Sequence, residues 1–199
     1  TTADGTTGAY TIAPTVALSD GDYALTVTAT DAAGNISDAS DALSITIDAT
    51  APGKPSIITT TTLTNDSTPT IEGIAEAGST VTLFVDGVAT GLTTTADATT
   101  GAYTIAPTAD LSDGNYALTV TATDAAGNIS AASEALSITI DATAPAKPSI
   151  ITTTALTNDS TPAIEGIAEA GSTITLLNGG VAIGTTTANG DGQFSITTS

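Results

Sequence analysis

The sequence repeats itself every 93 residues, and this period constrains the fold more than any other feature. Asp48 recurs as Asp141, and Tyr10 recurs as Tyr103. Residues 1–47 match residues 94–140 with only six differences. Repetition this close is typical of a module that works as one of many copies. We therefore expect a window on a longer tandem array, in which similar domains are joined end to end.

The period divides the chain into three parts. Residues 1–47 are the later part of one repeat, residues 48–140 are a complete repeat, and residues 141–199 are the earlier part of a third. Each junction carries a similar stretch, Ile47 to Pro55 and Ile140 to Pro148. Because these stretches follow a strand-like run and contain two prolines, we interpret them as stiff linkers between domains.

Within the complete repeat, alternating apolar and threonine residues predict short strands. The clearest case has Tyr116, Leu118 and Val120 on one face and threonines on the other. Asp86-Gly87 predicts a tight hairpin. The seven expected strands lie roughly at Pro55–Leu63, Thr70–Ala75, Thr80–Val85, Thr90–Ala96, Ala102–Ala106, Tyr116–Thr123 and Ala135–Ile140.

Seven short strands in about 90 residues predict an all-β immunoglobulin-like sandwich. With no cysteine in the sequence, the sandwich must be disulfide-free. The four tyrosines fall at positions expected in the core, whereas Phe84 is expected to face outward. The predicted fold is thus a tandem, end-to-end array of seven-stranded β-sandwiches.

Charge and composition exclude several functions. The formal net charge is -19, with 21 acidic residues and two lysines. Nucleic acids and anionic membranes are disfavoured as partners, because both require clustered positive charge. No apolar run is long enough to cross a bilayer. The sequence has no His and no Cys, so histidine bases, thiol nucleophiles and zinc sites are absent, and we expect neither an enzyme nor a small-molecule substrate.

The acidic residues concentrate in loops that alternate strand direction would bring to the two ends of the sandwich. Asp48 lies in the linker that enters the complete repeat, and Asp141 in the linker that leaves it. Loop acids and amides at these ends are expected beside the linkers. The candidates are Asp20, Asp22 and Asp113 from the end where a repeat finishes, and Asp124, Asn128, Glu76 and Asp97 from the end where it begins.

Oxygen ligands without His or Cys suit Ca²⁺ better than transition metals, and its flexible geometry tolerates ligands from several segments. Each junction is therefore a candidate calcium site. The alternative interpretation is that Asp and Asn simply form turns, as these residue types commonly do.

At DATAP, TATDAAGNIS and IEGIAEAGSTVTLFVDG, the sequence resembles the bacterial immunoglobulin-like repeats of giant biofilm-associated adhesins of the RTX type. These are type I-secreted surface proteins. The resemblance implies an extracellular location on the bacterial cell surface and a spacer function that supports adhesion and biofilm formation. It also implies calcium between neighbouring repeats, which are the expected partners.

Carried onto this sequence, the resemblance implies linker ligands at Asp48 and Asp141. It implies loop ligands at Asp31 and Asn35 in the first copy, and at Asp124 and Asn128 in the second. Only the junction at Asp48 has both neighbours within the sequence. Lys54 is expected to form a salt bridge with an acid near this junction.

Two other functions remain open from the sequence. Small sandwich domains can bind a glycan or a protein through their loops. Alternatively, chains placed end to end could complete one another's partial repeats by strand complementation, so that other copies of the chain would be partners and the product a filament.

Overall fold

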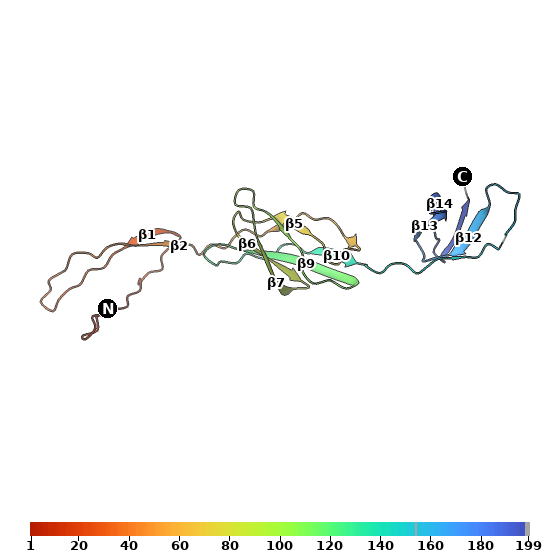
Figure 1. Cartoon of the computed structure of the whole chain (residues 1–199). Coiled ribbons are helices and arrows are strands. Elements are labelled where there is room, and N and C mark those ends of the chain that lie inside the picture. The colour runs from red at the N-terminus through yellow and green to blue at the C-terminus, as the bar shows by residue number, and fades with distance from the viewer. Residues whose placement is uncertain (154, 198–199) are drawn as a thin grey trace. The chain divides into compact units, whose positions relative to one another are not determined.

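A computed structural model describes residues 1–153 and 155–197 of the chain. All of the regular structure in this part is β-strand, which confirms the all-β class, and it includes no helix that could span a membrane. The chain divides into two compact units, Thr1–Asp141 and Ala142–Ser199. Each is described separately below (Figure 1).

The complete repeat is a sandwich of two sheets. One sheet has the order β4-β10-β9-β6-β7 and the other the order β3-β5-β8. Neighbours in these sheets are antiparallel, except for β4 and β10, which are parallel. The strands are β3 (Ser56–Ile57), β4 (Leu63–Thr64), β5 (Ile71–Ile74), β6 (Thr80–Val85), β7 (Val88–Thr95), β8 (Ala102–Ile105), β9 (Gly114–Thr123) and β10 (Leu136–Ile140).

The first expected strand, Pro55–Leu63, is in fact two short strands, and the single-strand prediction was wrong. β3 pairs with β5 in the smaller sheet, whereas β4 pairs with β10 in the larger one. The chain therefore passes from one sheet to the other between Ile57 and Leu63. Such a change of partner depends on the tertiary fold, so the period of the side chains does not reveal it.

The predicted hairpin between β6 and β7 is confirmed. Asp86 has a φ of 50° and Gly87 a φ of 78°, so both turn residues are left-handed, as a type I′ turn requires. The Asp86 carboxylate also accepts the Ala117 N–H at 2.8 Å, which ties the turn to the neighbouring strand β9.

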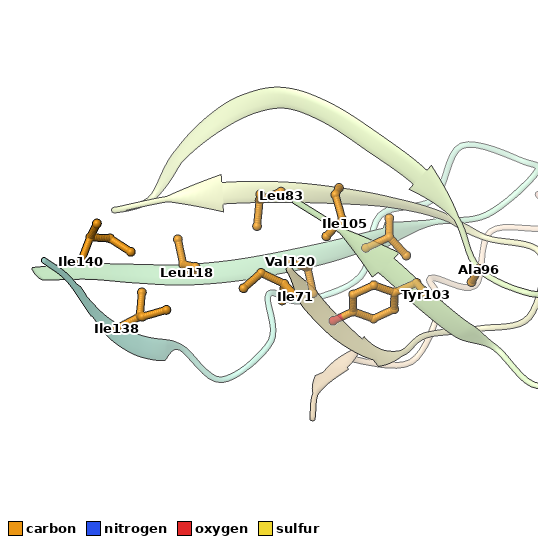
Figure 2. Close-up of a cluster of buried hydrophobic side chains, with 10 residues drawn as sticks. Ile71, Leu83, Ala96, Tyr103, Ile105, Leu118, Val120, Ile138 and Ile140 are labelled. Atoms are coloured by element: carbon orange, nitrogen blue, oxygen red, sulfur yellow. The ribbon is translucent and has the colours of Figure 1, made fainter. Parts of the chain in front are cut away.

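The core lies between the two sheets and consists mainly of aliphatic side chains, many of them β-branched (Figure 2). Leu118 and Val120 on β9 are fully buried, as is Leu83 on β6. From the smaller sheet, Ile71 and Ile105 face them across the sandwich. Because each side chain is small, the core depends on many close contacts between matched layers.

Tyr103 packs in this core against a glycine of the neighbouring strand. Its hydroxyl donates to the Ser56 carbonyl at 2.9 Å, and burial raises its pKa to about 12. A Cβ added at Gly73 would collide with the Tyr103 ring and the Ser56 carbonyl. The glycine thus provides the space that the ring fills, which is a known use of glycine in strands.

The other tyrosines differ from the expectation that all four are core residues. Tyr23 and Tyr116 are half-buried, and the Tyr116 hydroxyl donates to the Ser112 carbonyl at 3.0 Å, as in the tyrosine corner of immunoglobulin-like domains. Tyr10 is 55% exposed. Its counterpart Tyr103 is 4% exposed and lies against Gly73. Phe84 is half-buried and lies outside the core cluster.

The loops of the complete repeat gather at opposite ends of the sandwich, as strand alternation predicts. At one end, the Gly78 N–H donates to the Ala96 carbonyl, so the loop after β5 adjoins the loop after β7. At the other end, the Leu111 N–H donates to the Ser67 carbonyl, which joins the loops after β4 and β8.

The flanking parts of the chain repeat portions of this sandwich. In residues 1–47, β1 (Gly21–Leu25) pairs with β2 (Leu43–Ile47) in the register of β9 and β10. In the unit that begins at Ala142, one sheet has the order β11-β12-β15 and the other contains β13 and β14. These strands are β11 (Ser149–Ile150), β12 (Ala163–Ile167), β13 (Thr173–Asn178), β14 (Val181–Thr187) and β15 (Gln193–Thr197).

We predict that Gly73→Ala destabilises the complete repeat, because the added methyl group would displace Tyr103 and the backbone at Ser56. Overpacking of this kind costs about 1–3 kcal/mol. Urea denaturation followed by tyrosine fluorescence would measure the loss. Gly53→Ala is the matched control, since a Cβ at Gly53 meets nothing within 4 Å; equal stability of the two variants would contradict the prediction.

Candidate functional site

The linker between residues 48 and 55 is the candidate functional site, because the repeat on each side of it contributes contacts. Pro52 and Pro55 are buried. Their counterparts in the second unit, Pro145 and Pro148, are exposed. Within the complete repeat, Asn128 and Glu134 bond to this linker, at Asp48 and Lys54.

The repeat that precedes the linker holds it through Asp20. This carboxylate accepts the Ala49 N–H at 2.9 Å and the Thr50 hydroxyl at 2.5 Å. The Thr50 hydroxyl, and secondly the Ala49 N–H, lower the pKa of Asp20. Asp22 lies nearby in sequence but accepts the Thr46 hydroxyl at 2.6 Å, across the β1–β2 pair. Of these two predicted residues, only Asp20 bonds to the linker.

The repeat that follows the linker holds it through the loop 124–128. The two oxygens of Asp124 accept the Asn128 backbone N–H and side-chain amide, each at 2.8 Å. The same amide nitrogen donates to the backbone carbonyl of Asp48 at 3.0 Å. The Asn128 side chain is the main cause that lowers the pKa of Asp124. Gly127 has a φ of 94°, which closes this loop.

Lys54 adds a second contact to the following repeat. Its ammonium group forms an ion pair with Glu134, which confirms the expected salt bridge, and the hydrogen bond from Lys54 lowers the pKa of Glu134. The pair is open to solvent, with the Glu134 side chain 93% exposed. Exposed pairs contribute little free energy, so the pair orients the linker more than it stabilises the fold.

The equivalent loop in residues 1–47 has the same internal geometry. Asp31 accepts the Asn35 N–H at 2.8 Å and the Asn35 side-chain amide at 2.7 Å. The Asn35 side chain is again the main cause that lowers the pKa of the aspartate. Both residues are exposed, whereas Asp124 and Asn128 are half-buried. The loop therefore forms from its own residues, and contact with a linker is a separate event.

The remaining predicted residues do not join Asp124 and Asn128. Asp97 closes its own turn, where it accepts the Thr100 N–H at 2.7 Å and the Thr99 N–H at 3.0 Å, and these bonds contribute to its lowered pKa. Glu76 is exposed, and its backbone carbonyl accepts the Ser79 hydroxyl. Asp113 lies just before β9. Asp141 lies just after β10, and its backbone N–H donates to the Thr64 carbonyl.

Within residues 1–153 and 155–197 there is no group of three or more acidic side chains placed to hold a metal. Calcium binding therefore stays a prediction. Around the Asn128 amide nitrogen, the linker gathers the Asp124 carboxylate and the backbone carbonyl of Asp48, and the Asp20 carboxylate bonds to the next two residues of the linker.

Sequence reasoning missed two contributors to this site. Thr50 supplies a hydroxyl to Asp20, and Glu134 pairs with Lys54. The recurrence of Thr50 as Thr143, and of Glu134 as the acidic Asp41, was the available signal. The sequence shows that both positions are polar in each copy, but the partner of each side chain depends on how the junction folds.

Comparisons with known proteins identify the type of domain. The sequence profile of the bacterial Ig-like domain matches residues 1–49 and 56–142, more than half of the chain. No curated protein matches the sequence. Among solved structures, the chain is similar to the fibronectin(III)-like modules of Clostridium thermocellum CbhA, at 16% identity and a TM-score of 0.41. That alignment covers 62% of this chain and 64% of the other.

We predict that the contact between Asp20 and the linker is lost in acid. Because hydrogen bonding lowers the pKa of Asp20 in the folded protein, the contact is present above the ordinary aspartate pKa and is lost as the pH falls through the lowered value, below about 4. A carboxyl ¹³C titration by NMR would follow it. Thr50→Val removes the main donor and should raise the pKa of Asp20; an unchanged titration midpoint would contradict the prediction.

Proposed function

The chain belongs to the bacterial Ig-like domain family, and we propose that it is a run of spacer domains in a large bacterial surface adhesin. In this function, each domain adds length, and the array holds a binding region away from the cell to support adhesion and biofilm formation. The proposed location is extracellular, and the proposed role is structural rather than catalytic. The near identity of the copies supports the proposal, because a spacer needs a repeated module more than a specialised one.

The observation that carries the proposal is that both neighbouring repeats bond to the same short linker. Asp20 holds residues 49 and 50 from one side. Asn128 holds the carbonyl of residue 48 from the other. Contacts between domains of one chain are usually small enough to allow relative motion. A linker held at consecutive residues from both sides would restrict that motion, which is the property that a spacer requires.

The two prolines of the linker also restrict motion between the domains. Pro52 and Pro55 fix their own φ angles and limit the conformations of the residues before them. Both are buried at the junction. The backbone between Asp48 and Ser56 thus has few free torsions, and its remaining freedom is reduced by the hydrogen bonds at residues 48 to 50.

We further propose that Ca²⁺ strengthens this junction. The donor set around the linker fits a hard cation, since it consists only of carboxylate, amide and carbonyl oxygens. Asp124, Asn128 and the carbonyl of Asp48 would hold the ion, with Asp20, Asp22 and the acids of the neighbouring loops as further candidates. The ion would supply positive charge in a chain whose formal net charge is -19.

The residues themselves indicate why a cation would be favoured. The amide nitrogen of Asn128 places its hydrogens between two acceptors, the Asp124 carboxylate and the Asp48 carbonyl. Those acceptors therefore converge on a point of partial positive charge. An Asn side chain can rotate to present its oxygen instead, which would leave three oxygens directed to the same place.

We predict that Ca²⁺ raises the melting temperature of the chain and that a chelator reverses the effect. An ion at a hundredfold excess over its Kd stabilises the folded state by about 2.7 kcal/mol, which raises Tm by roughly 10 °C for a domain of this size. Calorimetry with Ca²⁺ and then with EDTA would measure the shift. No shift at millimolar Ca²⁺ would refute calcium binding.

Asp124→Asn should abolish the part of this response that comes from the junction. Asp31→Asn is the matched control, because it alters the same loop motif where it is exposed and does not contact residues 48–50. The junction response should survive in the control. If both variants respond equally, calcium does not bind through Asp124.

We also predict that the maximum dimension of the chain measured by small-angle X-ray scattering is shorter, and its distribution broader, in the Asp20→Ala/Asn128→Ala double variant than in the wild type. The double variant removes both holds on the linker and leaves the sandwich core intact. The same dimension in both proteins would show that these bonds do not restrict the linker.

A further inference from the structure

The larger sheet of the complete repeat presents an uncharged face to solvent. Its five strands, β4, β6, β7, β9 and β10, all lie within the described residues and contain no charged side chain. The acids of the repeat lie instead in its loops, its linker and β5. Threonines take many of the outward positions, and the register places Thr82 opposite both Thr93 and Thr121. The exposed sheet of a strongly acidic chain is thus covered by short hydroxyl groups rather than by charges.

A hollow of about 640 Å³ lies on this face, beside the turn between β6 and β7. Ala117 on β9 lies between Asp86, which bonds to its backbone, and Ser137, which is its partner on β10. The short side chain of Ala117 leaves room between those of its two neighbours. Asn115 and Thr139, the next pair along the same strands, line the hollow as well. Its volume is within the range of sites that bind small ligands.

The polar groups of the hollow combine donors and acceptors. One oxygen of Asp86 accepts the Ala117 N–H at 2.8 Å, so its second oxygen can accept a hydrogen bond from a ligand. The Asn115 oxygen accepts the Thr139 hydroxyl at 2.7 Å, so its NH₂ group can donate to a ligand. The exposed Ser137 hydroxyl can do either. A molecule with adjacent hydroxyl groups can donate to the carboxylate and accept from the amide at the same time.

We propose that this hollow binds a sugar residue of a neutral polysaccharide, which goes beyond the spacer function. A carboxylate at the hollow and a formal net charge of -19 on the chain disfavour anionic sugars. Phe84 lies two residues before Asp86 and therefore on the same face of β6, where it is half-buried and outside the core cluster. Alternate residues of a strand are about 7 Å apart, so the aromatic ring and the hollow can contact adjoining sugar residues.

The same hollow recurs over β1 and β2, one period earlier. It is lined there by the counterparts of residues 115–117 and 137–139, namely Asp22, Tyr23, Ala24, Ser44, Ile45 and Thr46. The complete repeat follows this copy directly and belongs to the same compact unit. Asp22, Ala24 and Ser44 nevertheless remain exposed. A repeat that follows along the chain therefore leaves the hollow open to a ligand.

One difference between the two hollows identifies the residue that decides binding. Asp22 takes the place of Asn115, whereas the other five lining residues are the same in both copies. A carboxylate there accepts hydrogen bonds and does not donate them. The complete repeat thus has both the donor and the acceptor that a pair of sugar hydroxyls requires. In an array, weak binding at each repeat that carries the asparagine would add up to firm attachment along a polysaccharide.

Affinity electrophoresis of the whole chain tests the proposal. Native gels would contain dextran, mannan or galactomannan as neutral polysaccharides, and alginate as the anionic one. We expect at least one neutral polysaccharide to slow the migration of the chain as its concentration rises, and alginate to leave the migration unchanged. Unchanged migration in all three neutral gels would overturn the proposal, and so would equal retardation in alginate.

Asn115→Asp then locates the site, because it replaces the donating amide by a carboxylate. The first copy already has aspartate at this position, where Asp22 keeps the bond to the threonine of the next strand, so the fold tolerates the change. Binding should weaken about tenfold. Thr104→Asp is the matched control, since it adds the same charge at an exposed position of β8 in the smaller sheet, and it should bind as the wild type does. Equal binding by the two variants, whether retained or lost in both, would overturn the assignment of the hollow.

Discussion

Pairing of β9 with both β6 and β10 is the interaction on which the rest of this structure depends. β9 is the longest strand, and its inward side chains Leu118 and Val120 lie at the centre of the closed core. With these three strands paired, the larger sheet covers the smaller one, and the apolar side chains between them are removed from water.

The junction depends on the same closure. The loop that bonds to the linker leaves β9 directly at Thr123, so its position follows from the strand. Its internal bonds form even where it is exposed, at Asp31 and Asn35. On the complete sandwich, this loop bonds both internally and to the neighbouring linker. The equivalent loop in residues 1–47 makes only the internal bonds. The residues of the turn determine the conformation of the loop, and the tertiary fold places the loop beside the linker.

Much of this fold could be predicted from the sequence, because the strands are short, regular and repeated. β6 lies at Thr80–Val85, as its alternation predicts, and the Asp86-Gly87 turn has the expected torsions. Prediction failed where the outcome depends on distant partners. The division of the first strand into β3 and β4 follows from a change of sheet, and Tyr10 is exposed although Tyr103, in the same local sequence, is buried. For the site, the concentration of acids at the ends was visible, but most of those carboxylates accept bonds from nearby N–H groups, and which of them reach the linker depends on the folded geometry.

The linker has a consequence for proteolysis. Both lysines of the chain are followed directly by proline, at Lys54-Pro55 and Lys147-Pro148, and there is no arginine. Proteases specific for basic residues need an ordinary amide after the lysine, and proline provides neither the N–H nor the required backbone freedom. At the first site, Pro55 is also buried. The segment that joins the domains, usually the most easily cut part of such a chain, therefore offers no susceptible bond to trypsin-like enzymes.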